Sequence, residues 1–110
     1  MSYEVKILNT AKKDIKKLSK KYPKIKIDLL NLIDSLENNP FLGISLGDSF
    51  YKIRIKNSSV SKGKSGGFRV IYYVVLDDEE VLLLKLFSKS DIETLSNNEI
   101  VALLKSNLED

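Results

Sequence analysis

The 110-residue sequence contains no cysteine and no histidine. Without cysteine the chain has no disulfide framework, no thiolate metal site and no cysteine nucleophile. Without histidine any general acid–base chemistry must use Lys, Arg, Tyr, Asp or Glu side chains, and a zinc site is nearly excluded because carboxylates alone rarely hold this metal. We therefore expect neither a metal nor a cofactor.

Long hydrophobic runs are also missing. No stretch reaches the roughly 18 consecutive apolar residues of a membrane span, and no signal-peptide pattern opens the chain. Repeats, low-complexity tracts and linkers are absent too. With 43% hydrophobic and 30% charged residues the composition is that of an ordinary globular protein. We expect one domain, residues 1–110, in the cytoplasm and without a membrane partner.

The positive charge is unevenly distributed. The net charge is only +3, but the first 26 residues carry nine lysines against two acidic residues. The compensating acids lie in the Asp77-Asp78-Glu79-Glu80 turn and at the C-terminal end. A basic surface favours polyanions such as RNA, DNA or the ribosome. For the lysine-rich segment itself, a solvated helix face or a docking surface is favoured over a catalytic site.

Apolar periodicity predicts a strand and two helices in the first forty residues. Tyr3 to Leu8 alternates as a strand does. Asn9 and Thr10 suit a helix N-cap, and the helix that follows breaks near Tyr22-Pro23. A second apolar stripe at helical spacing stops at residues 38–40 and comprises Ile25, Leu29, Leu32, Ile33 and Leu36. The two helices are expected to form a hairpin over one face of a sheet.

The second half predicts a meander of three strands, followed by a helix. After an irregular connection at residues 41–49, the expected strands are Phe50–Lys56, Phe68–Leu76 and Val81–Phe87. Two capping-box patterns follow, Ser90-x-x-Glu93 and Ser96-x-x-Glu99, with a short turn and then a helix from about residue 97 to 106. The order β-α-α-β-β-β-α predicts an α+β domain with helices on one side of an antiparallel sheet.

The candidate site is a basic face on this sheet. In the strand after Phe50, Tyr51, Ile53 and Ile55 point one way, and the cations Lys52, Arg54 and Lys56 point the other. Between Phe50 and Leu76 there are six basic residues and no acidic one. If the strands pair as a meander, cations converge from distant positions, and the set comprises Lys52, Arg54, Lys56, Lys62, Lys64, Arg69, Lys85 and Lys89.

Phosphates are the natural ligands of such a surface, and aromatic side chains could stack on bases. The aromatic candidates are Tyr51, Tyr72, Tyr73 and Phe87, although packing in the core is favoured for Tyr72 and Tyr73. Lysines on a solvent-facing strand also serve simply to prevent edge pairing. Arg69 is less easily explained that way, because a cation inside an apolar central strand is costly unless it is paired or functional.

Two stretches carry a family resemblance. Lys62-Gly63-Lys64-Ser65-Gly66-Gly67-Phe68-Arg69-Val70-Ile71-Tyr72-Tyr73, and the later Leu86-Phe87-Ser88-Lys89-Ser90-Asp91, resemble the RelE/ParE superfamily of bacterial toxins. The "GKSGG-x-RVIYY" and "SKS" signatures are closest to its HigB-like branch. Tyr51-Lys52-Ile53-Arg54 is similar to the "YKIR" strand of RelE-type members. The resemblance covers nearly the whole chain and implies a RelE-like fold.

The resemblance implies a toxin of a type II toxin–antitoxin system that acts as a ribosome-dependent mRNA endonuclease. Such toxins enter the ribosomal A site and cut the codon there by attack of a ribose 2′-hydroxyl on its own phosphodiester, without metal. The implied partners are the ribosome, mRNA and a cognate antitoxin, here a helix-turn-helix protein of the HigA type. The free toxin is expected to be a monomer, and its antitoxin complex a hetero-oligomer.

Residue by residue, the resemblance implies catalytic roles for Arg69, Arg54 and Lys89. Arg69 would stabilise the phosphate and Lys89 would transfer a proton or stabilise the leaving group. RNA binding is implied for Lys52, Lys56, Lys62, Lys64 and Tyr73. The RelE pattern has an arginine directly after that last lysine and a tyrosine in the C-terminal segment. This sequence has Ser90 and about Leu95 or Ser96 at those positions.

Two alternatives remain open. A ParE-like relative would share the scaffold but block DNA gyrase by binding, without nuclease chemistry. A catalytically degenerate module would bind only nucleic acid or antitoxin, as the missing C-terminal tyrosine permits. Cleavage of translated mRNA, inhibition of gyrase, and salt-dependent RNA binding without cleavage distinguish the three.

Overall fold

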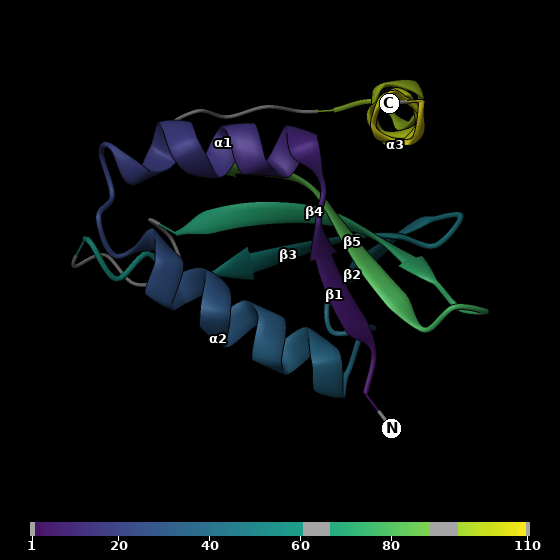
Figure 1. Cartoon of the computed structure of the whole chain (residues 1–110), viewed down its shortest axis with the longest axis horizontal. Coiled ribbons are helices and arrows are strands. Elements are labelled where there is room, and N and C mark those ends of the chain that lie inside the picture. The colour runs from purple at the N-terminus through teal and green to yellow at the C-terminus, as the bar shows by residue number, and fades with distance from the viewer. Residues whose placement is uncertain (1, 61–66, 89–94, 110) are drawn as a thin grey trace.

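The computed structural model describes residues 2–60, 67–88 and 95–109. These residues form eight elements (Figure 1). In chain order they are β1 (Glu4–Ile7), α1 (Asn9–Ser19), α2 (Ile25–Asn38), β2 (Ile44–Gly47), β3 (Phe50–Ile55), β4 (Phe68–Val75), β5 (Glu80–Ser88) and α3 (Asn97–Leu108). None of the described helices is long and apolar enough to cross a membrane. The α+β fold class predicted from the sequence is confirmed.

One sheet joins all the described strands in the order β1-β5-β4-β3-β2. The predicted meander is confirmed, because β3 pairs antiparallel with β4 and β4 antiparallel with β5. The expected all-antiparallel sheet is wrong in one respect. The first strand reaches β5 from the far side and pairs with it in parallel, with Val5 opposite Val81.

The segment 41–49 is not the irregular connection expected from its glycines. It contains β2, which forms an antiparallel hairpin with β3 and places Ile44 opposite Lys52. The turn is tight because Gly47, Asp48 and Ser49 all have positive φ values of 91°, 52° and 70°. Glycine and aspartate tolerate this left-handed region better than most residues. β2 is too short for its alternation to be recognised in the sequence.

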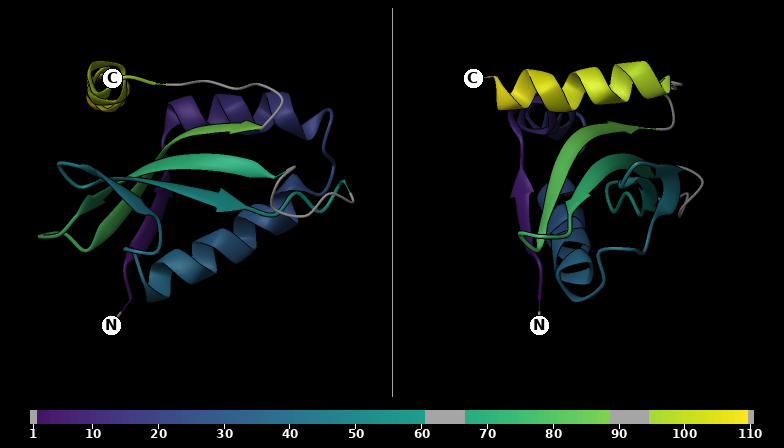
Figure 2. Two further views of the ribbon diagram at one scale, coloured as in Figure 1. Left: turned by 180° about the vertical axis from the view of Figure 1, so that it is seen from behind. Right: turned by 90° about the vertical axis from the view of Figure 1, so that its right-hand side faces the viewer.

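Helices cover both faces of the sheet (Figures 1 and 2). The α1–α2 hairpin packs on one face, where Val70, Tyr72 and Val74 of β4 join its core. The opposite face of β4 presents Ile71, which packs with Ile100 of α3. The prediction that all helices lie on one side is therefore wrong. The β4 run is apolar at successive positions, so each of its faces needs a cover.

The C-terminal half of β5 is closed by side chains of α1 rather than by another strand. The Thr10 hydroxyl donates to the Leu84 carbonyl at 2.5 Å, and the Leu86 N–H donates to an Asp14 carboxylate oxygen at 2.9 Å. The other Asp14 oxygen pairs with the Lys85 ammonium at 3.2 Å. These contacts satisfy backbone groups that an edge strand would otherwise leave unpaired.

The C-terminal helix α3 begins as predicted and ends two residues later than expected. Ser96 and Glu99 form the capping box, with the Glu99 N–H donating to the Ser96 hydroxyl and the Ser96 N–H to the Glu99 carboxylate. Near the other end, the Asn107 amide donates to the Thr10 hydroxyl at 3.0 Å and accepts the Thr10 N–H at 3.2 Å. Residues 89–94, which include the other expected capping box, Ser90-x-x-Glu93, lie outside the described part.

Replacement of Asp14 tests how the β5 edge is closed. Asp14→Ala removes the acceptor of the buried Leu86 N–H and the carboxylate beside Lys85, and we expect a loss of about 2 kcal/mol in the free energy of unfolding. Urea titration followed by circular dichroism measures it. Lys13→Ala, at an exposed position of the same helix, should change stability by less than about 0.5 kcal/mol. Equal effects of the two substitutions would contradict the assigned role.

Candidate nucleic-acid interface

The alternation predicted for β3 is confirmed. Tyr51, Ile53 and Ile55 pack with the core beneath α1 and α2. Lys52 and Arg54 must then lie on the other face, because successive side chains of a strand point in opposite directions. Lys52 is half-buried and Arg54 is exposed. Two cations thus share the sheet face on which α3 packs.

Arg69 joins these cations from the neighbouring strand. The β3–β4 register places Arg54 directly opposite Arg69, and paired residues share a face with Cβ atoms about 5 Å apart. Arg69 is half-buried, and its guanidinium donates to the Gly67 carbonyl at 3.2 Å.

Like charges facing each other across a sheet repel unless an anion lies between them. Strands β2, β3 and β4 carry no acidic residue. Within the described residues, no carboxylate forms a salt bridge with Lys52, Arg54 or Arg69. We call these three residues the cation cluster. Its unneutralised charge on one sheet face suits a phosphate better than any group of the described protein.

An apolar groove of about 550 Å³ adjoins the cation cluster. Lys52 and Arg54 line it together with Ile53 and four residues of the β2 region, namely Leu42, Gly43, Ile44 and Leu46. Ile44 is 74% exposed, which is unusual for so large an apolar side chain. Reasoning from the sequence missed this groove, because it depends on the β2 strand that the sequence did not reveal.

The backbone at Gly43 closes against the core tyrosine. Its N–H donates to the Tyr72 hydroxyl at 2.9 Å. A Cβ at this position would lie 2.8 Å from the Lys52 carbonyl oxygen and 2.9 Å from that hydroxyl. A side chain larger than that of glycine would clash here, so Gly43 is what allows the β2 region to approach β3 beside the groove.

The tyrosines of β4 lie in packed surroundings. Tyr72 is completely buried and stacks on Tyr51, with ring centroids 5.4 Å apart. Burial raises the pKa of the Tyr72 phenol above its ordinary value of 10.0. Tyr72 therefore cannot serve as a base at neutral pH. Tyr73 is half-buried against Phe50, with centroids 4.8 Å apart, and RNA binding by Tyr73 stays a prediction.

The chain leaving β3 is fastened to α2. Buried Asp28 accepts from the Ser58 N–H at 2.9 Å and from the Ser58 hydroxyl at 2.5 Å. The Ser59 hydroxyl accepts the Lys24 N–H at 3.0 Å, at the start of the same helix. These bonds fix the course of the backbone just beyond the exposed Lys56, and so hold the end of the strand that carries Arg54.

The structure brings together only part of the predicted basic set. Lys62, Lys64 and Lys89 lie outside the described residues. Lys85 does not join the cation cluster but pairs with Asp14 on α1. The reason is positional, because Lys85 lies in the part of β5 that α1 borders.

In the described part of the chain no three acidic side chains gather as they would around a metal ion.

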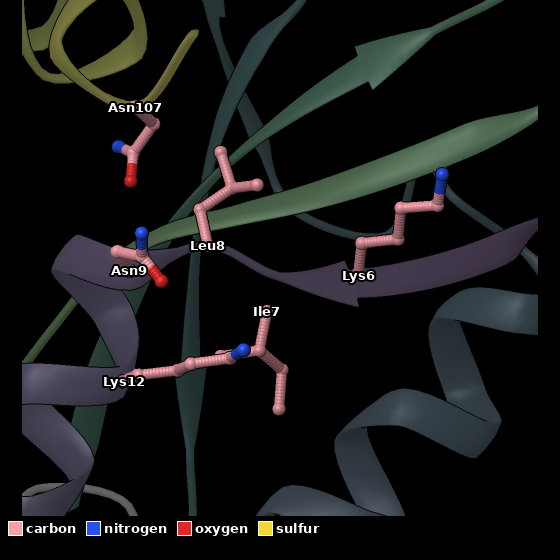
Figure 3. A pocket seen from close by; sticks show the side chains of 6 residues that line it. All are labelled: Lys6, Ile7, Leu8, Asn9, Lys12 and Asn107. Carbon is pink, nitrogen blue, oxygen red and sulfur yellow. The ribbon is translucent and has the colours of Figure 1, made fainter. Parts of the chain in front are cut away.

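A second hollow, of about 450 Å³, lies at the N-terminal end of α1 (Figure 3). Its lining residues come from β1, α1 and α3 and are Lys6, Ile7, Leu8, Asn9, Lys12 and Asn107. Lys6 forms an ion pair with Glu80, which raises the pKa of the lysine. This hollow shares no residue with the groove beside the cation cluster, and it contains no carboxylate.

Comparisons with known proteins identify similar chains. The sequence model of a family described as "ParE toxin of type II toxin-antitoxin system, parDE" matches residues 5–93. The fold is similar to a chain in the toxin–antitoxin complex RelBE2 from Mycobacterium tuberculosis, with a TM-score of 0.61 and 19% identity over 81% of this chain and 100% of that one.

A free-state mutant of the E. coli toxin RelE gives a TM-score of 0.59 and 16% identity, over 99% of this chain and 97% of that one. No curated protein matches the sequence significantly. At these identities the two structural likenesses establish the fold.

The cation cluster should bind single-stranded RNA through its phosphates. Arg54→Gln and Arg69→Gln should each weaken binding of a 2′-O-methyl oligonucleotide, which cannot be cleaved, and reduce the log–log salt slope by about 0.7 per lost contact. Fluorescence anisotropy at several salt concentrations measures both quantities. Lys105→Gln, at an exposed position of α3, is the matched control and should leave the slope unchanged.

Burial of Tyr72 makes stability depend on alkaline pH. The unfolded chain ionises this phenol near pH 10, whereas the folded chain keeps it protonated. The stabilisation is therefore complete below about pH 10 and is lost as the pH rises through the raised value. Urea midpoints between about pH 9 and pH 11 should fall less steeply in Tyr72→Phe than in the wild type. Phe41→Leu, which removes no ionisable group, should retain the wild-type slope.

Proposed function

We propose that this chain, which belongs to the family of ParE toxins of type II toxin–antitoxin systems, is a ribosome-dependent mRNA endonuclease. The observation that carries the proposal is the cation cluster, in which Lys52, Arg54 and Arg69 share one sheet face and form no salt bridge with a carboxylate of the described residues. A protein that acts by binding alone does not need cations from two strands to converge on one point.

Metal-free RNA cleavage needs such a cluster. The ribose 2′-hydroxyl gives up its proton to water as its oxygen attacks the adjacent phosphorus, the bond from phosphorus to the 5′-oxygen breaks, and a 2′,3′-cyclic phosphate and a 5′-hydroxyl end are formed. The phosphorane in between carries extra negative charge. Positioned cations stabilise that charge more than they stabilise the substrate, which lowers the barrier. We assign this role to Arg54 and Arg69.

The remaining roles are assigned to other basic residues and one tyrosine. Lys52 and Lys56 would hold the flanking phosphates, together with Lys62 and Lys64, which precede β4 in the sequence. Lys89 would protonate the leaving 5′-oxygen. Tyr73 would contact a base. Tyr72 is excluded from contact with the reacting atoms because its side chain is completely buried.

The proposed partners are the ribosomal A site, mRNA and a cognate antitoxin. One of the similar structures is a toxin–antitoxin complex, which supports a protein antitoxin for this chain as well. We propose a helix-turn-helix antitoxin of the HigA type. The chain would be a monomer when free and part of a hetero-oligomer when neutralised.

Inhibition of DNA gyrase is the second candidate. The family description names the ParE toxin and so favours this activity. This activity differs from the first candidate in its target, since mRNA would stay intact while supercoiling stops.

The departures from the RelE pattern at Ser90 and in the segment near Leu95 instead favour the catalytically degenerate module, which would bind RNA without cutting it.

Induced expression in a bacterial host tests the proposal directly. Wild-type toxin should stop growth and produce cuts within translated codons, mapped by primer extension on an abundant message. Arg54→Ala and Arg69→Ala should each lower cleavage by a factor of about 10² to 10³, the usual cost of removing a group that stabilises transition-state charge. Lys89→Ala should also reduce it. Lys26→Ala, at an exposed position of α2, should cut like the wild type.

Two outcomes would overturn the endonuclease assignment. Growth arrest with intact messages and inhibited gyrase supercoiling would establish the second candidate. Soluble wild-type protein that binds translating ribosomes without cutting would establish the degenerate module.

A further inference from the structure

The outer side of α1 is a dense array of lysines. Every exposed position from residue 12 to residue 21 is lysine, and the positions between them are buried or half-buried. The lysines fall into two lines of four-residue spacing, Lys12-Lys16-Lys20 and Lys13-Lys17-Lys21. Within α1 four residues rise about 6 Å, so Lys12–Lys16 and Lys13–Lys17 lie nearly along the axis, and Lys20 and Lys21 follow directly after the helix ends at Ser19. We call these six residues the lysine rows.

The positive charge of the lysine rows is not neutralised by the described protein. Asp14 is the one acidic residue of α1, and it faces β5, where it binds Lys85 and the Leu86 N–H. Within the described residues no salt bridge involves any of the six lysines. Lysines four apart on a helix repel one another. The arrangement therefore weakens the isolated helix and favours an external polyanion.

The composition of the lysine rows fits nucleic acid better than protein. Protein interfaces have a desolvated apolar or aromatic centre and are depleted in lysine. This surface has no apolar residue at an exposed position between Lys12 and Lys21. Arginine is preferred for bidentate recognition of carboxylate and phosphate alike, whereas lysine binds phosphate as a point charge without geometric selectivity. The lysine rows contain no arginine.

The same composition favours a duplex over a single strand. Proteins hold single strands by stacking bases on aromatic rings. Tyr22, which is the aromatic residue nearest to the rows in sequence, is buried with its ring against Phe68. A-form duplexes are recognised by shape and through their backbone. A straight helix with lysines in parallel lines can follow such a backbone without reading sequence.

The lysine rows and the cation cluster lie on different surfaces. Ala11 and Leu18 of α1 pack toward the core that includes Val70 and Tyr72, whereas the cluster lies on the sheet face on which α3 packs (Figure 2). The exposed lysines therefore lie on the sides of α1 that do not face this core, and Lys12 also lines the hollow at the start of the helix. One molecule could engage a single strand at the cluster while α1 contacts a separate duplex.

We propose that the lysine rows of α1 form a second RNA-binding surface, which holds the phosphate backbone of double-stranded RNA. The source of this duplex rests on the proposed function. For a toxin that acts in the ribosomal A site, that RNA is a folded segment of ribosomal RNA beside the site. Two contacts on one particle raise the effective concentration of the cation cluster near its substrate. The lysine rows thus determine affinity for the ribosome, and the cluster determines cleavage.

Binding of a short blunt RNA duplex tests the proposal apart from nuclease activity. The triple variant Lys13→Gln, Lys17→Gln, Lys20→Gln removes half of the rows, and glutamine retains similar helix propensity. Fluorescence anisotropy between about 50 and 200 mM salt should show binding at least tenfold weaker than wild type, with a log–log salt slope lower by about 2 to 3. The charge-conserving triple substitution to arginine should bind as wild type does.

Further variants and ribosomes complete the test. Lys26→Gln with Lys105→Gln, at exposed positions of α2 and α3, should leave duplex binding unchanged, because neither lysine belongs to the lysine rows or to the cation cluster. With ribosomes, the glutamine variant should raise the KM of mRNA cleavage severalfold at constant kcat. If neither the wild type nor any variant cleaves mRNA, the proposed function fails. Binding of the RNA duplex, measured by anisotropy, still tests the present inference in that case. Circular dichroism confirms that each variant is folded.

Three results would overturn the inference. The wild type could fail to bind the duplex at the lowest salt concentration, or the glutamine variant could bind with the wild-type affinity and slope. The glutamine variant could also retain duplex binding while losing affinity for an acidic protein, which would assign the lysine rows to a protein partner.

Discussion

The architecture depends on the burial of both faces of β4. This strand is apolar at successive positions, and its only charged side chain, Arg69, lies next to its first residue. Hydrophobic burial contributes about 25 cal/mol per Å², so neither face can be left in water without a large loss of stability. The α1–α2 hairpin covers one face and α3 covers the other. The end of β4 that carries Arg69 is where the cation cluster forms.

The two edges of the sheet are bordered differently. β5 is bordered by the short parallel strand β1 along its first half and by side chains of α1 along its second half. Asp14 therefore serves the edge and neutralises Lys85, which removes that lysine from the basic face. At the opposite edge, β2 stays open and carries the exposed Ile44, beside the groove that adjoins Lys52 and Arg54.

Charge is separated onto two surfaces by the fold. The cation cluster lies on a sheet, where the register places Arg54 opposite Arg69 on neighbouring strands. The lysine rows lie on a helix, where flexible ammonium groups are spread along an axis. The first arrangement suits stabilisation of one highly charged phosphate, and the second suits contact with many phosphates. Both lie in a chain whose net charge is only +3, so the distribution matters more than the total.

The sequence by itself determined the elements whose signals are local. The period of two in residues 51–55 assigned Lys52 and Arg54 to one face, the apolar stripe from Ile25 to Leu36 located α2, and the Ser96–Glu99 box located the start of α3. Other features became visible only in the folded chain. Arg54 lies opposite Arg69, Lys85 pairs with Asp14, and residues 44–47 form a strand. In addition, β1 is parallel to β5 and α3 covers the second face of the sheet. The physical reason is that periodicity and capping depend on neighbours within a few residues. Register, edge closure and ion pairing are settled here by segments more than seventy residues apart, as for Asp14 and Lys85.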